Sequence, residues 1–414
     1  MTHYLSYSLA IVLVLFGLIA KGTTITVGPN AVHTINEALT LSNDCDTIRV
    51  TSGTYKEGTI SINRPVVLLG EGWPVIDGEE KGDVLLVTAS HVVIEGFVFR
   101  GTAISDMNDH AAINAVGLSD LIVRNNRIEQ CFFGIRLNSV RRAIIEHNVV
   151  TGDPSLEENR RANGIHLWKC ASITIHGNRV QYHRDGIYLE FVTDSHIDYD
   201  TSAFNSRYGL HFMFSHRDSY THNIFEENGA GVAVMFTHHV TMTDNRFHNN
   251  CGASSYALML KEINDVEIAR NTFTDNTIAI LLDGCNRGKV HDNYFGNNGW
   301  AAKLFANSMD CVFETNTFTG NTFDVTTNGD LVLSKLKGNY WDRYRGYDLD
   351  RNGLGDVPYR PFGLFALVTE RMPYAMVLSR SLMVQLLDQA EQLLPSLTPK
   401  ALEDLTPLMK PPHG

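Results

Sequence analysis

The pentapeptide Gly209-Leu-His-Phe-Met213 and its counterpart Gly231-Val-Ala-Val-Met235, 22 residues further on, decide the fold. Alternation with period two is typical of β-strands, and a repeat of about 20 to 50 residues is typical of a solenoid. We therefore predict an all-β fold, a right-handed parallel β-helix in which each repeat forms one coil. The same pattern, a small residue followed by alternating apolar and variable positions, begins at Gly134, Gly164, Gly186, Gly209, Gly231, Ala257, Ala279 and Ala301.

A second recurring feature is an asparagine followed two positions later by an apolar or aromatic residue. In a β-helix, residues at the same place in successive coils lie about 4.8 Å apart. We therefore expect these asparagines to form a ladder of side-chain amides at one corner, where they satisfy backbone groups. They are Asn126, Asn148, Asn178, Asn223, Asn245, Asn271, Asn293 and Asn316.

The repeats cover the middle of the chain, and the two ends differ from it. The apolar run Leu9–Ala20 suits the core of an export signal and is too short to span a bilayer. No Lys or Arg precedes it, so an uncleaved anchor is the alternative. A short helix over Val32–Leu41 would cap the first coil. The chain is thus divided into a signal peptide (1–22), the β-helix (23–345), a polar capping loop (346–371), a C-terminal amphipathic helix (372–394) and a tail (395–414).

The C-terminal helix carries more apolar residues than one buried stripe requires. It either folds back over the last coil or docks on a partner. The candidate docking residues are Pro373, Tyr374, Met376, Leu382, Leu386 and Leu387.

The composition excludes some functions. The formal net charge of −12 argues against a nucleic-acid partner, because phosphate binding needs clustered positive charge. The six cysteines contain no C-x-x-C pair, so we expect most of them to be small buried apolar residues. No phosphate-binding Gly-Lys-Ser/Thr loop occurs, so we expect this chain to bind no nucleotide.

The third and fifth positions of each pentapeptide should point outward and form two columns. The first column is Arg136, His166, Tyr188, His211, Ala233, Met259, Leu281 and Lys303. The second column is Asn138, Trp168, Glu190, Met213, Met235, Lys261, Asp283 and Phe305.

These columns are rich in methionine, histidine and aromatic residues, which is unusual for a solvated surface. The repeat places Met213 beneath Met235 and His216 beneath His238. Thioether and imidazole groups suit Cu(I), so we expect transient copper binding on this face. A protein-binding patch that includes Trp168 and Tyr188, or burial beneath an insertion, are the alternatives. The candidate copper ligands are Met213, Met235, Met259, His166, His211, His216 and His238.

Catalysis is not expected. Enzymes that act on acidic polysaccharides need clustered acid and base groups. The central coils offer only the isolated Glu190, Lys261 and Asp283 in one column.

A second candidate metal site lies after the last repeat, in residues 348–356. Its carboxylates at alternate positions and its glycine resemble the beginning of a calcium loop. The twelfth position is Tyr359 rather than glutamate, so this is not an EF-hand, and a turn that only hydrogen-bonds to itself is the alternative. The candidate calcium ligands are Asp348, Asp350, Asn352 and Asp356.

Several segments together resemble the NosD family. The most specific is Tyr208-Gly-Leu-His-Phe-Met-Phe-Ser-His216, with its echo Met235-Phe-Thr-His-His239. The stretch from Asn339-Tyr-Trp to Tyr359 and the helix beginning Met372-Pro-Tyr-Ala-Met are also similar.

The resemblance implies a periplasmic, non-enzymatic role in assembling the copper-sulfur centre of nitrous oxide reductase. It further implies an ABC-type ATPase and a multi-span membrane subunit as partners, with a copper-carrying lipoprotein and nitrous oxide reductase itself. Two other hypotheses stay open: a polysaccharide-binding or polysaccharide-modifying β-helix, and a scaffold that contacts only proteins.

Overall fold

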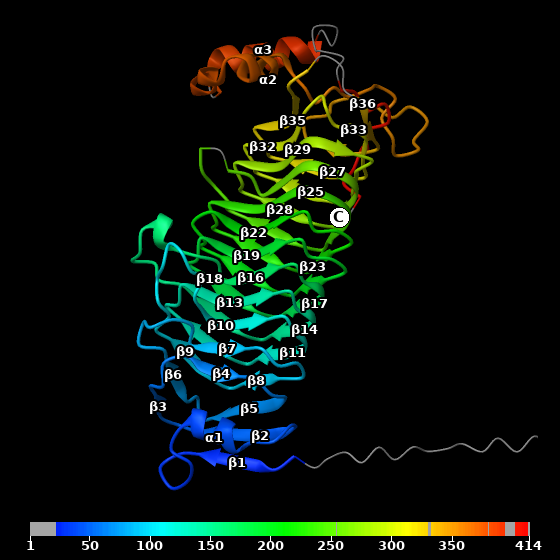
Figure 1. Ribbon diagram of the computed structural model, residues 1–414. Coiled ribbons are helices and arrows are strands. Elements are labelled where there is room, and N and C mark those ends of the chain that lie inside the picture. The colour runs from blue at the N-terminus through cyan, green and yellow to red at the C-terminus, as the bar shows by residue number, and fades with distance from the viewer. Residues whose placement is uncertain (1–21, 254, 330–332, 380, 394–401, 413–414) are drawn as a thin grey trace, which may run out of the picture.

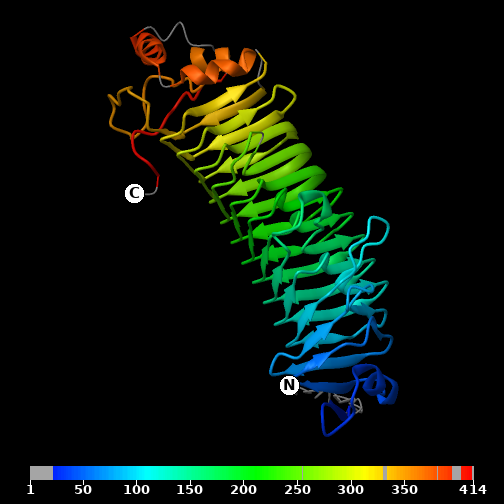
Figure 2. The ribbon, with the colours of Figure 1, turned by 90° about the vertical axis from the view of Figure 1, so that its left-hand side faces the viewer.

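The computed structural model describes residues 22–253, 255–329, 333–379, 381–393 and 402–412. They form one elongated stack of coils, with the N-terminal coil at one end and helices at the other (Figures 1 and 2). Every strand pairing within the described sheets is parallel, and each coil pairs with the coils before and after it. The predicted parallel β-helix is confirmed. The predicted signal peptide lies outside the described residues, apart from Gly22.

The coils have three faces. The first face contains β4 (Ile60–Ile62), β7 (Leu85–Val87), β10 (Ala111–Val116), β13 (Phe133–Asn138), β16 (Ile165–Trp168), β19 (Asp185–Glu190), β22 (Tyr208–Met213), β32 (Trp300–Leu304) and β35 (Phe323–Thr327). The second face contains β1 (Thr24–Val27), β2 (Asp46–Thr51), β5 (Val66–Glu71), β8 (Val93–Glu95), β11 (Ser119–Arg124), β14 (Arg141–Glu146), β17 (Ala171–His176), β20 (His196–Asp198), β23 (Ser219–Thr221), β30 (Lys289–His291), β33 (Met309–Glu314) and β36 (Leu333–Lys337). Three long strands join these two faces: β25 (Ala230–Thr243), β27 (Leu258–Ala269) and β29 (Ile278–Asn286).

The third face is a separate sheet of short strands. It contains β3 (Thr54–Tyr55), β6 (Val75–Asp77), β9 (Val98–Arg100), β12 (Arg127–Glu129), β15 (Val149–Thr151), β18 (Arg179–Gln181), β21 (Thr201–Ala203), β24 (Ile224–Glu226), β26 (Arg246–His248), β28 (Thr272–Thr274), β31 (Tyr294–Gly296), β34 (Thr317–Thr319) and β37 (Tyr340–Trp341). The middle residues of these strands point inward. In the later coils they form a stack of parallel rings from Phe247 to Trp341, with centroids 4.2 to 5.0 Å apart.

The predicted asparagine ladder is present at the corner before the third face. Most of the side-chain oxygens accept hydrogen bonds from both the backbone and the side-chain amide of the ladder residue one coil earlier, as Asn271 does from Asn245 at 2.9 and 3.0 Å. A second ladder, which we did not predict, lies at the next corner. It consists of Asn205, Asn228, Asn250, Asn276, Asn298 and Asn321.

Asp200 interrupts the first ladder. Its Oδ1 accepts from the Asn178 backbone amide at 2.6 Å, but its buried Oδ2 has no hydrogen-bond partner. Burial raises the pKa of Asp200 to about 7, against the opposing effect of the bonds from Asn178. The protonated form of Asp200 therefore suits this ladder position, where the other coils have a neutral asparagine.

Replacing Asp200 by asparagine should stabilise the protein more at pH 8 than at pH 5. Asp200 has a pKa near 4 in the unfolded chain and about 7 in the folded one. The wild type is therefore most stable below pH 4 and loses stability as the pH rises through about 7. The free energy of unfolding of the variant should exceed that of the wild type by about 4 kcal/mol at pH 8, and the difference should fall toward zero at low pH. Denaturant unfolding of both proteins at the two pH values measures it. An equal effect at pH 5 and pH 8 would contradict this account.

The N-terminal end is capped as expected. Helix α1 (Ile35–Leu41) begins three residues later than the predicted Val32, because the Thr34 side chain accepts from the Glu37 backbone amide at 3.1 Å. Its residues Ile35, Ala38 and Leu39 are buried against the first coils.

The C-terminal helices differ from the single helix that we predicted. Helix α2 (Leu364–Arg371) begins inside the predicted polar loop, followed by the 3₁₀ helix η2 (Pro373–Leu378) and by α3 (Leu382–Leu393). Met372, with φ −136° and ψ 81°, separates α2 from η2, because proline disfavours the helical conformation in the residue before it. We call α2, η2 and α3 together the helical appendage.

Residues 402–412 of the predicted tail return to the β-helix. Asp404 pairs with Leu336 and Tyr359, and Leu408 pairs with Tyr340. The fully buried Asp404 carboxylate accepts the last bond of the first asparagine ladder, from the Asn339 backbone amide at 2.9 Å. The tail therefore caps the final coil.

Candidate functional site

The two predicted outward columns have the predicted register. On the first face, Tyr188 lies beside His211 and Glu190 beside Met213 in β19 and β22. Met213 then lies beside Met235 in β25. The strand pairings also align the other column residues from Arg136 to Lys303 and from Asn138 to Asp283.

Most candidate copper ligands of the first column are covered. His211 is 6% exposed and its ring centroid lies 4.7 Å from that of Tyr208 and 5.1 Å from that of Tyr188. Met259 is 9% exposed and packs in a cluster with Tyr256, which lies in the insertion between β26 and β27. The insertion alternative therefore applies to Met259, whereas tyrosines of the coils themselves cover His211.

His166 lies in the same covered column. It stacks on Tyr188 with a centroid separation of 4.8 Å, and its Nδ1 is 2.9 Å from the Asn163 side-chain amide. Burial lowers the pKa of His166 to about 4. The remaining partner candidate on this face, Trp168, is half-buried with the Lys169 ammonium 4.2 Å from its ring centroid.

Four candidate ligands lie at the corner between the first and second faces: Met213 and Met235 of the second column, and His216 and His238 three positions after them. Met213 and Met235 are half-buried in adjacent coils. The rings of His216 and His238 stack with centroids 4.0 Å apart and an interplanar angle of 8°. Burial and the nearby His238 lower the pKa of His216, which favours the neutral form of this ring. We call Met213, Met235, His216 and His238 the Met–His corner.

Sequence reasoning missed the aromatic residues that lie between these methionines and histidines. Phe191, Phe214 and Phe236 stack with centroids 5.3 and 5.2 Å apart. Each is 38 to 44% exposed and has a φ of 50 to 55°, a left-handed conformation at the corner. Their signal is a phenylalanine directly after the second-column residue in three successive repeats.

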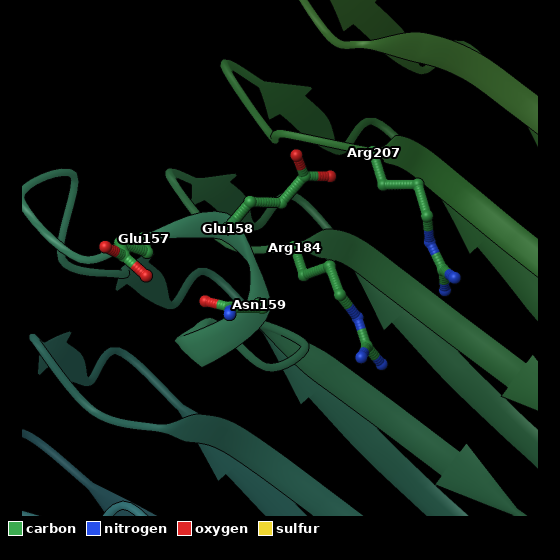
Figure 3. A pocket seen from close by; sticks show the side chains of 5 residues that line it. All are labelled: Glu157, Glu158, Asn159, Arg184 and Arg207. Carbon is green, nitrogen blue, oxygen red and sulfur yellow. The ribbon is translucent and has the colours of Figure 1, made fainter.

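A pocket of about 460 Å³ opens elsewhere on the molecule, at the beginning of the first-face strands. The loop that contains η1 (Glu158–Arg160) contributes Glu157, Glu158 and Asn159, and the coils contribute Arg184 and Arg207 (Figure 3). Arg207 forms an ion pair with the fully buried Asp185, and Asp185 lies 3.6 Å from His211. The pocket lining includes no residue of the Met–His corner.

The turn at 348–356 brings the three predicted carboxylates together. Ligand oxygens of Asp348, Asp350 and Asp356 lie within 4.8 Å of one another, which makes this the only such group of His, Cys, Asp or Glu ligands in the described chain. The carboxylates also accept hydrogen bonds from backbone amides of the same turn. For example, the Gly353 amide donates to Asp348 at 2.9 Å. The Asn352 side-chain oxygen accepts from Leu354 at 2.7 Å. The oxygen donors fit Ca²⁺, and the turn is also hydrogen-bonded without it.

The helical appendage exposes some of the predicted docking residues and buries others. Met376 and Leu387 pack against a cluster containing Phe362, Phe365 and Val384. Pro373 is the first residue of η2, and its side chain is not among those that the structure describes. The strongly exposed apolar residues are Tyr374 at 92%, Val377 at 88%, Met383 at 74%, Leu382 at 70%, Met372 at 64% and Leu386 at 57%.

The fold places the chain in the class of parallel β-helix proteins. It is similar to the A-module of mannuronan C-5 epimerase AlgE6 from Azotobacter vinelandii, with 12% identity and a TM-score of 0.52 over 71% of this chain and 90% of that one. It is also similar to the catalytic domain of a GH87 α-1,3-glucanase, with 12% identity and a TM-score of 0.55 over 77% of this chain and 69% of that one. At this identity the likeness shows the fold alone.

The sequence comparisons relate this chain to one protein family. Residues 147–346 match the family model described as periplasmic copper-binding protein (NosD). Two relatives, from Pseudomonas aeruginosa and Stutzerimonas stutzeri, are each named probable ABC transporter binding protein NosD. They are 28% and 27% identical, over 86% and 88% of this chain and 86% and 87% of their own lengths. The comparisons bear out the likeness to NosD that the Tyr208–His216 motif predicted, since the model match lies within 147–346 and the two relatives align with most of the chain.

Proposed function

We propose that this chain is a periplasmic accessory protein for assembly of the copper-sulfur centre of nitrous oxide reductase, and that it handles Cu(I) transiently at the Met–His corner. The observation that carries the proposal is the stacking of Met213 on Met235 and of His216 on His238. The match to the family model, with its description as periplasmic and copper-binding, supports it.

The chemistry of the corner suits a monovalent soft ion. Thioether sulfur and neutral imidazole nitrogen are donors that favour Cu(I), and they come from adjacent coils rather than from one flexible loop. Met235 also packs against the buried cluster of Ala230, Ala233, Tyr256 and Met259, which restrains its side chain. All four side chains are half-buried rather than enclosed, so a partner could reach the ion.

The Met213→Ala, Met235→Ala double variant should bind Cu(I) roughly 100-fold more weakly than the wild type, about 2.8 kcal/mol. Loss of both thioethers leaves only the imidazoles as soft donors. Anaerobic titration in competition with a chromophoric Cu(I) chelator measures the affinity. Met309→Ala is the matched control, because Met309 is 44% exposed on the second face and lies outside the corner. Unchanged affinity in the double variant would remove the copper site from this corner.

The partners that we propose are the other components of an ABC-type complex. The two relatives are named as ABC transporter binding proteins, which supports an ABC-type ATPase and a multi-span membrane subunit as partners. The sequence contains no phosphate-binding loop, so the ATPase would be another chain. None of the described helices is long and apolar enough to cross a membrane. We propose that the helical appendage docks on the membrane subunit through its exposed apolar residues.

The donor and the recipient of copper complete the proposal. A copper-carrying lipoprotein would deliver Cu(I) to the Met–His corner, and nitrous oxide reductase would receive it. The exposed rings of Phe191, Phe214 and Phe236 offer apolar contact area for such partners beside the ligands. We infer an accessory rather than a catalytic role, since Met213 and Met235 separate Glu190 from Lys261 in the column and only Lys261 and Asp283 are neighbours.

Calcium is a further proposed ligand, in the turn at 348–356. Asp348, Asp350 and Asp356 would hold it through carboxylate oxygens. This turn adjoins the capping tail, since Leu354 pairs with Leu408. Calcium there would stabilise the end of the solenoid rather than take part in copper transfer.

A further inference from the structure

Two of the buried cysteines lie next to each other in adjacent coils. Cys285 is at the end of β29 and Cys311 is in β33, and both are fully buried. The Cys311 Sγ lies 3.3 Å from the Cys285 carbonyl oxygen. A hydrogen bond to Cys311, together with burial, raises the pKa of the Cys285 thiol well above its usual value.

Gly288 leaves the space between the two sulfur atoms open. A Cβ atom at this position would lie 3.1 Å from the Cys285 Sγ and 3.2 Å from the Cys311 Sγ. Both distances are closer than ordinary van der Waals contact, so a larger residue would push the sulfur atoms away. The two sulfurs therefore border the same gap.

The coil geometry also brings the two cysteines to the same corner. Val312 donates to the Gly288 carbonyl at 2.8 Å, so the two cysteines belong to directly paired coils. The strand register pairs Asn286 with Met309 and Lys289 with Val312, so Cys285 and Cys311 are not strand partners, and it is their side chains that meet beside Gly288. The other buried cysteines, Cys131 and Cys170, contact backbone carbonyls rather than a second sulfur.

We propose that Cys285 and Cys311 form an intramolecular disulfide that locks one coil of the β-helix to the next. Each thiol loses its proton, one S–S bond forms, and the two electrons reduce the disulfide of an exchanging partner to two thiols. Such dithiol-disulfide partners are typical of the oxidising compartment to which the family description assigns these proteins. Because both sulfurs are buried in the finished fold, the exchange takes place before the coil closes. The proposal does not depend on copper handling.

A peptide map of the full chain tests the link. The protein is refolded with oxidised glutathione, unfolded in the presence of a thiol alkylating reagent and digested with trypsin without reductant. Cleavage after Arg287 and Lys303 places the cysteines in different peptides, 271–287 and 304–335. We expect these two peptides to be joined and to lack two hydrogen atoms, and the joined species to disappear on reduction.

Two variants and a stability measurement complete the test. Cys285→Ser should abolish the joined species and leave Cys311 alkylated, whereas Cys131→Ser should retain it. The oxidised wild type should unfold at a higher temperature than the reduced wild type, because the link restricts the unfolded chain. Alkylated Cys285 and Cys311 in the oxidised wild-type protein, or a link to another cysteine, would overturn the proposal even if a variant fails to fold.

Discussion

Replacing Asp404 by alanine should free the last coils of the β-helix and lower their stability by about 3 to 5 kcal/mol. The carboxylate accepts bonds from the backbone amides of Gly338 and Asn339 at 3.0 and 2.9 Å, and from the Asn339 side chain at 3.1 Å. It also accepts from the Trp341 indole at 3.1 Å. Alanine would leave these buried donors without a partner.

Amide hydrogen exchange across the final strands, together with the thermal unfolding temperature, would measure the loss at Asp404. Leu405→Ala is the matched control, since this neighbour is 63% exposed and its side chain should matter little. Asp404→Asn should lose less than alanine, because its amide oxygen still accepts. Unchanged exchange in the alanine variant would mean that residues 402–412 do not cap the solenoid.

The Val377→Asp, Met383→Asp double variant should fail to co-purify with the membrane subunit. These side chains are 88% and 74% exposed, so aspartate costs little in the free protein. In an apolar interface, two unpaired carboxylates would lose several kcal/mol of solvation, which weakens binding by more than roughly 100-fold. Affinity purification of the tagged chain from membranes that contain its partners measures the effect.

Met107→Asp is the control for the docking experiment, because this side chain is 91% exposed in the loop between β9 and β10, many coils before the helical appendage. The control should co-purify as the wild type does. Co-purification of the double variant at the wild-type level would exclude the appendage as the docking element. Cu(I) affinity should be unchanged in both proteins, since the Met–His corner belongs to the central coils.

The register of the solenoid was predictable residue by residue. A repeat of nearly constant length converts sequence spacing directly into vertical stacking, so Met213 was expected beneath Met235 and His216 beneath His238, as the structure has them. The same spacing also predicts the stack of Phe191, Phe214 and Phe236, each one position after a second-column residue. We missed this stack because we considered only two columns.

The covering of the columns was not predictable in the same way. His211 and Met259 lie at outward positions, yet Tyr208 and the inserted Tyr256 enclose them. Nothing in the repeat specifies where an insertion of irregular length packs. The candidate ligands therefore divide into an open set and a covered set only once the insertion is placed.

By itself the sequence determined the parallel β-helix, its coil register, its asparagine ladder and its likeness to NosD, because each follows from periodicity or from a contiguous motif. Only the tertiary structure decided which outward residues reach solvent, how the helical appendage divides, and that Asp404 returns to close the last coil. Those features come from contacts between non-repeating segments and the coils. Such contacts depend on shape and hydrogen-bonding geometry, which no periodic pattern encodes.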